Sequence, residues 1–469
     1  MAVVQIGEIV EVAKGKLISG DSSIWLASYS IDSRTLKPGD LFFAIQGAHH
    51  DGHQFVAEAL RRGAKGAIIS REVELPRELI SANLIMVRNT HQALMELATH
   101  FRRKWKVEVV GVTGSSGKTT TKEIIFALLR GDYKVKRTPG NYNNLYGLPL
   151  GMLSLEEKDE VFVGEMGISE PGEMEKLIKI AQPNVGVITN VNPVHMEFFS
   201  SVEEIAVEKG KLLESLSGER VAIVNSDDPW TAKAMARFKG KIIPFGIKNS
   251  SDIMGKDIAW KELEGGSFTV VVNKGEEEKL FIPLVGLYNL YNALAAIAVA
   301  CYFKVPLAAI RERLARYKGM PMRSRVLRFK EGFTLIDDSY NSNPRALELV
   351  LDYFKSLTTK GRKIVISGDM LELGEWSEEA HREAGRLIGN GGIDLLIGVG
   401  NLSRKSLEEA QKAGMPPASL VHFPDSSQVG PFLSSLIREK DLILVKGSRA
   451  MKMELIVEYL KKHFNLEGD

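Results

Sequence analysis

Short apolar runs alternate with amphipathic stretches over the first hundred residues. Three runs between Asp40 and Val87, LFFAI, AKGAIIS and NLIMV, have the length and composition of β-strands. HQFVAEALRRG has the helical period, and an amphipathic stretch from His91 to Lys106 predicts a long helix. The pattern predicts a small α/β domain over residues 1–105.

The next two hundred residues repeat a strand-then-helix pattern. A strand from Val107 to Val112 enters a glycine-rich turn and a helix that begins near Thr119. VFVG, VGVIT and VAIV are then followed by helical stretches at 173–181, 203–216 and 228–237. This order is typical of a doubly wound parallel sheet, so we expect a second domain over residues 106–318.

The last part of this second domain has a different pattern. Hairpin-like strands are expected between Ile258 and Ile282, with the charged run at 276–279 in a solvated turn. Helices are expected at 288–301 and 307–317.

A linker and a second α/β domain complete the chain. KGMPMRSR, residues 318–325, has no periodicity and contains glycine and proline, which favours a linker. Four apolar runs follow, KIVIS, DLLIGV, SLVHF and DLILV, each with a helical stretch behind it. We therefore expect a third domain with a parallel sheet over residues 319–469.

Composition and charge exclude several classes of protein. The 469 residues carry 61 Lys and Arg against 59 Asp and Glu, so no broad basic field attracts nucleic acid or an acidic membrane. The single cysteine, Cys301, cannot form an internal disulfide and is expected to be a buried thiol. No basic leader and no apolar stretch of about 18 residues is present, so we expect a cytoplasmic protein without membrane insertion.

The turn after the strand at 107–112 predicts a phosphate site. The segment GVTGSSGKTT, residues 111–120, contains three glycines, Lys118 and several hydroxyls between a buried strand and a helix. Glycines let backbone N–H groups face one anion, and the start of the helix adds the positive end of its dipole. Gly111 lies one position too early for the strict G-x-x-x-x-G-K-[ST] pattern, but Gly114 supplies the flexibility. The alternative is a glycine-rich turn without a ligand.

Two further side chains follow strands of the same predicted sheet. Glu165 comes directly after VFVG, where a carboxylate can bind Mg²⁺, and Thr119 has the position of the hydroxyl that ligates this ion. His195 follows VGVIT in the loop NVNPVH. A surface glutamate and a polar loop histidine are the alternatives.

Several motifs together resemble one family. They are GSSGKTT, Asn143-Asn144-x-x-Gly147-x-Pro149, Glu165-Met-Gly, Asn190 with His195, and Gly286-x-x-Asn289-x-x-Asn292. Over nearly the whole chain this set resembles the Mur ligase superfamily, ATP-dependent amide-forming enzymes of bacterial peptidoglycan assembly. The resemblance implies a central P-loop ATPase-like domain between a small nucleotide-sugar domain and a C-terminal Rossmann-like domain.

Two C-terminal motifs narrow the resemblance to one branch of the superfamily. DDSYNSNP at 337–344 and GDMLELG at 368–374 resemble the members that add D-alanyl-D-alanine to a UDP-N-acetylmuramoyl tripeptide. The resemblance implies ATP and Mg²⁺ as cofactors and these two small molecules as substrates.

The resemblance also assigns roles to residues around ATP. Lys118 and Thr119 are expected at the outer phosphates and Mg²⁺, within a loop formed by Gly114, Ser115, Ser116, Gly117 and Thr120. Glu165 and His195 are expected to bind metal, and Lys209, fourteen positions after His195, corresponds to a lysine that CO₂ carbamylates. Asn289 and Asn292 are expected at adenine, Asp338 at the ribose, and Arg323 at the phosphates. Taken singly, these residues also fit a solvated lysine or arginine, helix-cap asparagines and a turn aspartate. Tyr288 departs from the histidine that is frequent at its position in related ligases.

Substrate contacts are expected in all three domains. They are Ser33, Arg34, Asp51, Gly52 and His53 for uridine diphosphate, Asn143 and Asn144 in the central domain, and Asn341, Lys446, Ser448 and Arg449 for the dipeptide. Arg34 can make paired hydrogen bonds to a pyrophosphate. HHDGH, residues 49–53, fits a substrate loop better than a zinc site, since no cysteine is nearby.

Other functions are compatible with parts of the same motifs. The ligase that adds the third peptide residue and folylpolyglutamate synthase are rivals within the superfamily, and Asn343-Pro-Arg345 is interpreted as a turn and helix start. A nucleotide-switch protein is disfavoured because Asn273-Lys274 is followed by Gly275-Glu276, which is no guanine-reading NKxD motif. We expect a monomer, and the sequence leaves open whether the third peptide residue is lysine or diaminopimelate.

Overall fold

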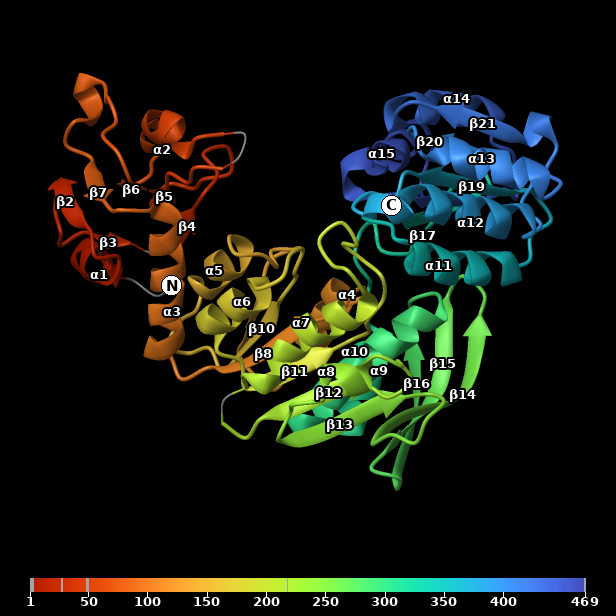
Figure 1. Ribbon diagram of the computed structural model, residues 1–469, viewed down its shortest axis with the longest axis horizontal. Helices are drawn as coiled ribbons and strands as arrows, with labels where there is room; N and C mark the ends of the chain where they lie inside the picture. The colour runs from red at the N-terminus through yellow and green to blue at the C-terminus, as the bar shows by residue number, and fades with distance from the viewer. Residues whose placement is uncertain (1–3, 27, 48–49, 217, 468–469) are drawn as a thin grey trace.

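The computed structural model consists of three lobes, each built on its own β-sheet (Figure 1). It describes residues 4–26, 28–47, 50–216 and 218–467. The N-terminal lobe and the C-terminal lobe lie on opposite sides of a central one, and a long helix, α3 (Thr90–Lys104), stands between the first lobe and the second (Figure 1).

The N-terminal lobe contains a small mixed sheet. Its elements before α3 are β1 (Val4–Gln5), α1 (Ile6–Val12), β2 (Lys16–Ser19), β3 (Trp25–Leu26), β4 (Ser28–Ser30), β5 (Asp40–Phe43), α2 (Val56–Arg61), β6 (Gly66–Ile69) and β7 (Asn83–Met86). The sheet order is β2-β7-β6-β5-β4, and only the β2–β7 pair is antiparallel. α3 begins where Asn89 accepts a hydrogen bond from the Gln92 N–H at 2.8 Å, so the long amphipathic helix is confirmed.

The central lobe contains a nine-stranded sheet. Its strands are β8 (Glu108–Thr113), β9 (Val135–Arg137), β10 (Val161–Glu165), β11 (Val185–Ile188), β12 (Val221–Asn225), β13 (Lys241–Gly246), β14 (Ile253–Lys261), β15 (Gly265–Val272) and β16 (Glu276–Ile282). Its helices are α4 (Lys118–Leu129), α5 (Gly147–Met152), α6 (Glu173–Ala181), α7 (Val202–Glu214), α8 (Thr231–Ala234), α9 (Leu287–Tyr302) and α10 (Leu307–Ala315).

The strand order places β8 at a switch point. The order is β16-β15-β14-β13-β12-β11-β8-β10-β9, parallel from β9 to β14 and antiparallel for the last hairpins. The chain leaves β8 toward β9 and β10 on one side and returns as β11 on the other. Ligands of open α/β sheets bind at the carboxyl ends of strands at such a point, so the loop after β8 lies where a ligand site is expected.

Two predictions for the central lobe are wrong. The charged run at 276–279 belongs to β16 rather than to a turn, since it pairs with β15 along its whole length. β16 is an edge strand, and such strands carry exposed charges that prevent pairing with other chains. The helix expected at 228–237 shrinks to α8, because Asp228 accepts a hydrogen bond from the Trp230 N–H at 2.8 Å and holds a turn there.

The C-terminal lobe has a six-stranded sheet in the order β17-β18-β22-β19-β20-β21. Its elements are β17 (Arg325–Arg328), β18 (Thr334–Asp338), α11 (Pro344–Ser356), β19 (Lys363–Gly368), α12 (Ser377–Gly389), β20 (Leu395–Val399), α13 (Ser403–Lys412), β21 (Leu420–Phe423), α14 (Val429–Leu436), β22 (Leu442–Lys446) and α15 (Glu454–His463). The four expected strands are confirmed, but the pattern missed β17 and β18, and β17 is antiparallel. Asn343 caps α11 by accepting from the Ala346 N–H at 2.9 Å, which confirms the predicted helix start.

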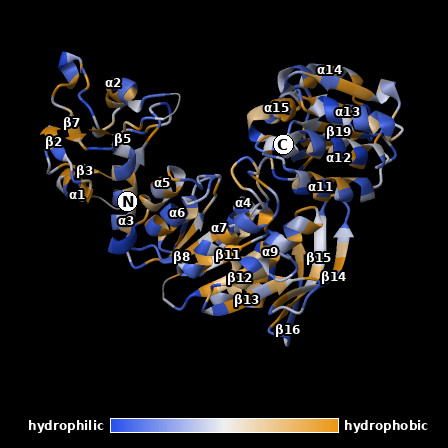
Figure 2. Ribbon diagram, in the orientation of Figure 1, coloured by the Kyte–Doolittle hydropathy of each residue, from blue (hydrophilic) through white to orange (hydrophobic). Residues whose placement is uncertain are grey.

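Hydrophobic residues follow the strands of the three large sheets, and hydrophilic ones colour the outer faces of the helices (Figure 2). One buried cluster runs from the N-terminal lobe through α3 into the central lobe, so these two lobes share a core. Cys301 is only partly buried, against the other face of the central sheet, although a buried thiol was expected. No helix among the described residues is long and apolar enough to cross a membrane. The proposed boundaries near 105 and 318 fall between α3 and β8 and between α10 and β17, and they remain a prediction.

Candidate functional site

The loop between β8 and α4 is shaped by two glycines. Gly114 has φ +146° and Gly117 has φ +77°, both outside the range that residues with a Cβ prefer. A Cβ on Gly117 would lie 2.1 Å from Asn292 Oδ1, and one on Gly114 would lie 2.0 Å from Thr189 Oγ1. The segment that follows β11 and the helix α9 therefore approach the loop so closely that only glycine fits.

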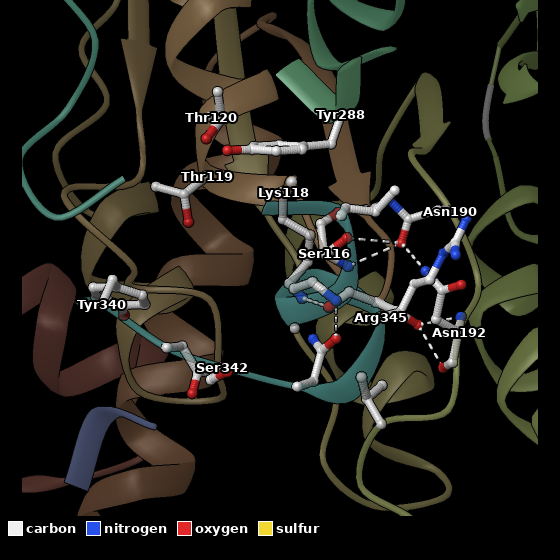
Figure 3. Close-up of a pocket in the computed structure, with 18 of the residues that line it drawn as sticks. Ser116, Lys118, Thr119, Thr120, Asn190, Asn192, Tyr288, Tyr340, Ser342 and Arg345 are labelled. Atoms are coloured by element: carbon white, nitrogen blue, oxygen red, sulfur yellow. Dashed lines mark hydrogen bonds between the residues drawn. The ribbon is translucent and has the colours of Figure 1, made fainter. Parts of the chain in front are cut away.

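Asn190, two residues after the end of β11, braces this loop. Its Oδ1 accepts hydrogen bonds from the Ser116 N–H at 3.0 Å and the Ser116 hydroxyl at 3.2 Å, and its carbonyl accepts from the Ser115 N–H at 2.9 Å. Figure 3 shows Ser116, Asn190 and Asn192 joined in this way beside Lys118. The loop is thus held in shape by protein contacts alone.

Lys118 and Arg323 place positive charge at the start of α4. The Lys118 ammonium folds back onto the loop and donates to the Gly114 carbonyl at 2.8 Å. Burial lowers the pKa of Lys118, although nearby Glu165 opposes the shift. Arg323 comes from the segment before β17, donates to Thr119 Oγ1 at 3.0 Å and stacks on the ring of Tyr340 at 3.9 Å. A cation from the end of the linker thus reaches the phosphate loop.

Glu165 ends β10 with its side chain 1% exposed. Its Oε1 accepts a hydrogen bond from Asn143 Nδ2 at 2.9 Å. Its Oε2 is buried without a hydrogen-bond partner among the described residues. A buried carboxylate oxygen that lacks a partner is costly unless a ligand binds it, and Mg²⁺ prefers such oxygens together with phosphates and water.

The metal prediction fits this carboxylate. Among the described residues, no group of three or more His, Cys, Asp and Glu side chains is arranged to hold a metal by itself. Mg²⁺ usually binds one or two protein groups and completes its octahedron with phosphates and water. Glu165 with Thr119 therefore suits a Mg²⁺ that arrives with a nucleotide.

His195 meets the C-terminal lobe. Its Nδ1 lies 2.7 Å from Glu372 Oε2, an ion-pair distance, although the atoms are not aligned for a hydrogen bond. His195 and Glu372 both have positive φ, +54° and +63°. Contact with His195 lowers the pKa of Glu372. The loop after β11 and the GDMLELG motif therefore touch across the two lobes.

Lys209 lies on α7 and is 1% exposed. No hydrogen bond or ion pair of its ammonium is found among the described residues, and its location is buried rather than solvated. Burial lowers the pKa of Lys209 well below its usual value, and the charge of Lys118 lowers it further. The alternative interpretation of Lys209 as a solvated lysine on a helix is therefore wrong.

Two asparagines on the first turns of α9 are buried beside the loop. Asn289 Nδ2 donates to the Val285 carbonyl at 2.8 Å, and its Oδ1 accepts from Asn292 Nδ2 at 3.2 Å. Tyr288, the residue that departs from the family pattern, bonds to the Ser324 hydroxyl at 2.6 Å. Tyr288 therefore ties α9 to the segment that leads into the C-terminal lobe.

The C-terminal lobe adds a second group of charged and polar residues. Asp338 accepts from the Ser324 N–H at 3.0 Å and from the Lys446 ammonium at 2.5 Å. Lys446 also donates to the Asn341 carbonyl at 3.0 Å. Ser448 is buried and accepts from the Leu371 N–H at 2.9 Å. The ends of β18 and β22 are thereby joined beside the GDMLELG motif.

Most predicted residues line one cavity of about 810 Å³ between the central and C-terminal lobes. The predicted residues in its wall are Ser115, Ser116, Gly117, Lys118, Thr119, Thr120, Asn143, Asn144, Glu165, His195, Asn289, Asn292, Arg323, Asp338, Asn341, Lys446, Ser448 and Arg449. In Figure 3 Tyr288 and Lys118 lie in the same view as Tyr340, Ser342 and Arg345 of the C-terminal lobe. Gly114 and Lys209 lie outside this wall.

Some of these side chains have local structural roles as well. Asn144 Oδ1 accepts from the Gly147 N–H at 2.9 Å and starts α5. Arg449 pairs with Glu454 at 2.8 Å. These contacts explain part of the polar pattern without a ligand.

The five predicted residues of the N-terminal lobe do not line this cavity. Arg34 pairs with Asp32 at 2.8 Å and its side chain is 81% exposed. Ser33 is buried, and a Cβ on Gly52 would lie 2.7 Å from the backbone of Ile45.

His53 is a buried structural histidine. Its Nδ1 lies 2.6 Å from Asp51 Oδ1, and its Nε2 accepts from the Ser70 N–H at 2.9 Å. Both ring nitrogens are engaged, so His53 has no nitrogen left for zinc. His49, the first residue of HHDGH, lies outside the described residues.

The chain matches sequence models of three Mur ligase domains. They are the Mur ligase family catalytic domain at 26–102, the Mur ligase middle domain at 112–300 and the Mur ligase glutamate ligase domain at 322–449. A UDP-N-acetylmuramoyl-tripeptide–D-alanyl-D-alanine ligase of Bacillus subtilis is 34% identical over 96% of this chain and 97% of its own. The chain belongs to the Mur ligase family.

Other family members agree over the full length. The Escherichia coli ligase of the same description is 31% identical over 99% of both chains. A MurF structure from Acinetobacter baumannii has a TM-score of 0.86 at 26% identity, covering 98% of this chain and 99% of its own. A Thermotoga maritima MurF ligase in complex with ADP has a TM-score of 0.77 at 31% identity, covering 93% and 97%. The predicted three-domain α/β Mur ligase fold is thus confirmed.

In or beside the cavity lie three further residues to which the sequence assigned no role. Tyr340 stacks on Arg323, Glu372 contacts His195, and Lys122 lies buried beside Glu165. Tyr340 and Glu372 belong to motifs that carried the family resemblance, so their position in DDSYNSNP and GDMLELG was an available signal.

Proposed function

We propose that this Mur ligase joins D-alanyl-D-alanine to a UDP-N-acetylmuramoyl tripeptide and converts ATP to ADP and phosphate. The observation that carries the proposal is the shared cavity. A phosphate loop from the central lobe and a cluster of charged residues from the C-terminal lobe face the same space. Relatives described as this ligase match nearly the full chain at 31–34% identity, which supports the same substrates.

The reaction needs an activated carboxylate. The terminal carboxylate of the tripeptide attacks the γ-phosphate of ATP, which gives an acyl phosphate and ADP. The amine of the dipeptide then attacks the acyl carbon and expels phosphate. Phosphorylation is required because a free carboxylate would have to expel oxide.

The residues around the loop neutralise charge during the first step. Two anions approach each other, so Lys118 and Arg323 are proposed to contact the phosphates, and the backbone of residues 114–120 to cradle them. Thr119, Glu165 and His195 would hold Mg²⁺, which would further neutralise the charge of the phosphates and orient them. Asn289, Asn292 and Asp338 are proposed at adenine and ribose.

Lys209 is proposed to be carbamylated. No hydrogen bond or ion pair of this buried amine is found among the described residues, and burial lowers its pKa, which favours the neutral form. The neutral nitrogen can form a bond to the carbon of CO₂ and release a proton. The resulting anion would help to position Mg²⁺, which an ammonium cannot do. We expect Lys209→Ala to lose most activity and to regain part of it with added short carboxylic acids. Full activity of this variant without them would exclude the carbamate.

The substrates of the other lobes follow from the family assignment. Ser33, Arg34, Asp51, Gly52 and His53 are proposed to form or support the uridine diphosphate site. Asn341, Lys446, Ser448 and Arg449 are proposed to receive the dipeptide carboxylate, with Asn143 and Asn144 near the tripeptide. Gly319, with φ +68° in the linker, is proposed to permit domain closure.

Product analysis tests the proposed function. ADP release should require the muramoyl tripeptide and D-alanyl-D-alanine together, and the product should be the pentapeptide. The same assay with free amino acids in place of the dipeptide tests the two rivals within the superfamily. ADP release with a free amino acid but not with the dipeptide would favour the ligase that adds the third residue or folylpolyglutamate synthase. ADP release that needs neither substrate would contradict a ligase and favour a nucleotide switch.

A further inference from the structure

Lys122 is a completely buried lysine one helical turn after Lys118. Both lie on α4, and at this spacing their side chains share one face of the helix. The Lys122 side chain is 0% exposed, and it does not line the cavity wall. A buried ammonium is expensive to desolvate, so it is retained only where several partners compensate its charge.

The partners of Lys122 surround the carboxylate of Glu165. Its ammonium donates to the Thr138 carbonyl at 2.8 Å and to the Gly140 carbonyl. It also lies 3.4 Å from Glu123 Oε1 and 3.6 Å from Glu165 Oε2. The oxygen that lies 3.6 Å from the ammonium is the buried one that has no hydrogen-bond partner in the described part of the chain.

A closed set of contacts links Lys122 to both oxygens of this carboxylate. The carbonyl of Thr138 accepts a hydrogen bond from Lys122. The hydroxyl oxygen of the same threonine accepts a hydrogen bond from the Glu165 N–H at 3.1 Å. The same loop continues to Asn143, which donates to Glu165 Oε1 at 2.9 Å. One lysine therefore fixes the loop that orients Oε1 and places its charge beside Oε2.

We propose that Lys122 is a positioning residue for the magnesium-binding carboxylate of Glu165. It fixes the loop that orients the carboxylate and places a positive charge beside Oε2, and it leaves this oxygen without a hydrogen bond among the described residues, so that the oxygen stays free for the ion. This role deepens the proposed function and rests on it. The alternative is a purely structural lysine that braces residues 138–140.

Magnesium-dependent ADP binding distinguishes the two roles. The affinity for ADP is measured by titration calorimetry with Mg²⁺ and with a chelator, and the ratio of the two affinities reports the metal site. We expect Lys122→Gln, which keeps N–H donors for the loop carbonyls but removes the charge, to reduce this ratio about tenfold or more. Lys122→Met, which removes donors and charge, should reduce it at least as far. ADP affinity with the chelator should stay within about twofold of the wild type, since Lys122 lies outside the cavity wall.

Glu123→Gln is the matched control. Glu123 is the second carboxylate that lies within ion-pair distance of the Lys122 ammonium, and it also pairs with Arg137 at 2.8 Å. Its substitution is therefore expected to change the stability of the protein without removing a contact of Glu165. The control should keep the wild-type ratio. In a Glu165→Gln background, Lys122→Gln should cause no further change, because contacting residues that act through one group are not additive.

Each outcome decides between the roles. An unchanged ratio in Lys122→Gln, with or without a lower melting temperature, would overturn the proposal. An equal loss in Glu123→Gln would do the same, because it would point to general disruption of the buried pairs. If the wild-type protein binds ADP equally with and without Mg²⁺, the nucleotide–metal assignment fails instead.

Discussion

The cavity between the central and C-terminal lobes and the predicted substrate segments of the N-terminal lobe differ in how their polar residues are used. Around the cavity, Oε2 of Glu165 lacks a hydrogen bond among the described residues, and no hydrogen bond or ion pair of the buried Lys209 amine is found there. In the N-terminal lobe, His53 has partners at both ring nitrogens and Arg34 is paired with Asp32.

This difference separates a cavity with unsatisfied buried polar groups from a surface whose polar groups are paired or exposed. Unpaired buried groups cost free energy in the protein alone, so their presence indicates a ligand that compensates them. Paired or exposed groups carry no such cost. For the N-terminal residues, the assignment to uridine diphosphate therefore depends on family resemblance rather than on an unsatisfied site.

The largest expected effect is at the phosphate loop. Lys118→Ala should reduce turnover about 10³-fold, because it removes a cation that is proposed to contact the transferred phosphate. The melting temperature should change little, since the hydrogen bonds of the ammonium to described residues go to carbonyls of its own loop. Steady-state ADP release and thermal unfolding measure both.

Lys179→Ala is the control for this substitution. Lys179 is an exposed lysine of α6 in the same lobe, and it does not line the cavity. Its loss should leave turnover unchanged. Near-normal turnover of Lys118→Ala would remove the phosphate role of the loop.

A smaller and more selective effect is expected in the N-terminal lobe. Arg34→Ala should raise the KM for the muramoyl tripeptide about tenfold, the value of one charge-assisted hydrogen bond, and leave the KM for ATP unchanged. Its side chain is largely exposed, so stability should not change. Initial rates at varied concentrations of each substrate separate the two constants.

Arg61→Ala provides the comparison in the same lobe. Arg61 is half exposed and pairs with Glu78 at 3.7 Å. It should leave both KM values unchanged. A rise in the KM for ATP in Arg34→Ala would contradict the separation of the two regions.

The smallest effect concerns a buried histidine next to GDMLELG. His381 Nε2 accepts from the Met370 N–H at 2.9 Å, and its Nδ1 donates to the Ser377 carbonyl at 2.6 Å. Burial lowers the pKa of His381 below its ordinary value of 6.5. The unfolded chain therefore takes up a proton below about pH 6.5 that the folded chain does not, and stability is lost as the pH falls.

Thermal unfolding at pH 7.5 and 5.5 measures this loss, which should amount to about 1 kcal/mol. His381→Gln should be less stable at the higher pH and should lose less stability between the two values. An equal loss in both proteins would show that other groups cause the pH dependence.

The sequence predicted the helices and strands whose hydrophobic residues recur at a regular period. It also predicted the site residues that lie directly after a strand. GSSGKTT and Glu165 lie at carboxyl ends of neighbouring strands, and parallel pairing brings such ends together. The charged part of β16 was missed because an exposed edge strand has no apolar alternation at its start.

Contacts between residues that are far apart in the sequence could not be predicted from the pattern of hydrophobic and polar positions. The meeting of His195 and Glu372 requires the arrangement of two lobes, which no local period encodes. The burial of Lys122 could not be predicted either, because a lysine on a helix is solvated far more often than buried.

Transfer of oxygen from substrate to phosphate tests the central claim most directly. The muramoyl tripeptide is labelled with ¹⁸O in its terminal carboxylate and is converted with ATP and D-alanyl-D-alanine. Attack by this carboxylate on the γ-phosphate predicts one ¹⁸O atom in each released phosphate, detected by mass spectrometry. Phosphate without the label would contradict the acyl phosphate and the role assigned to the shared cavity.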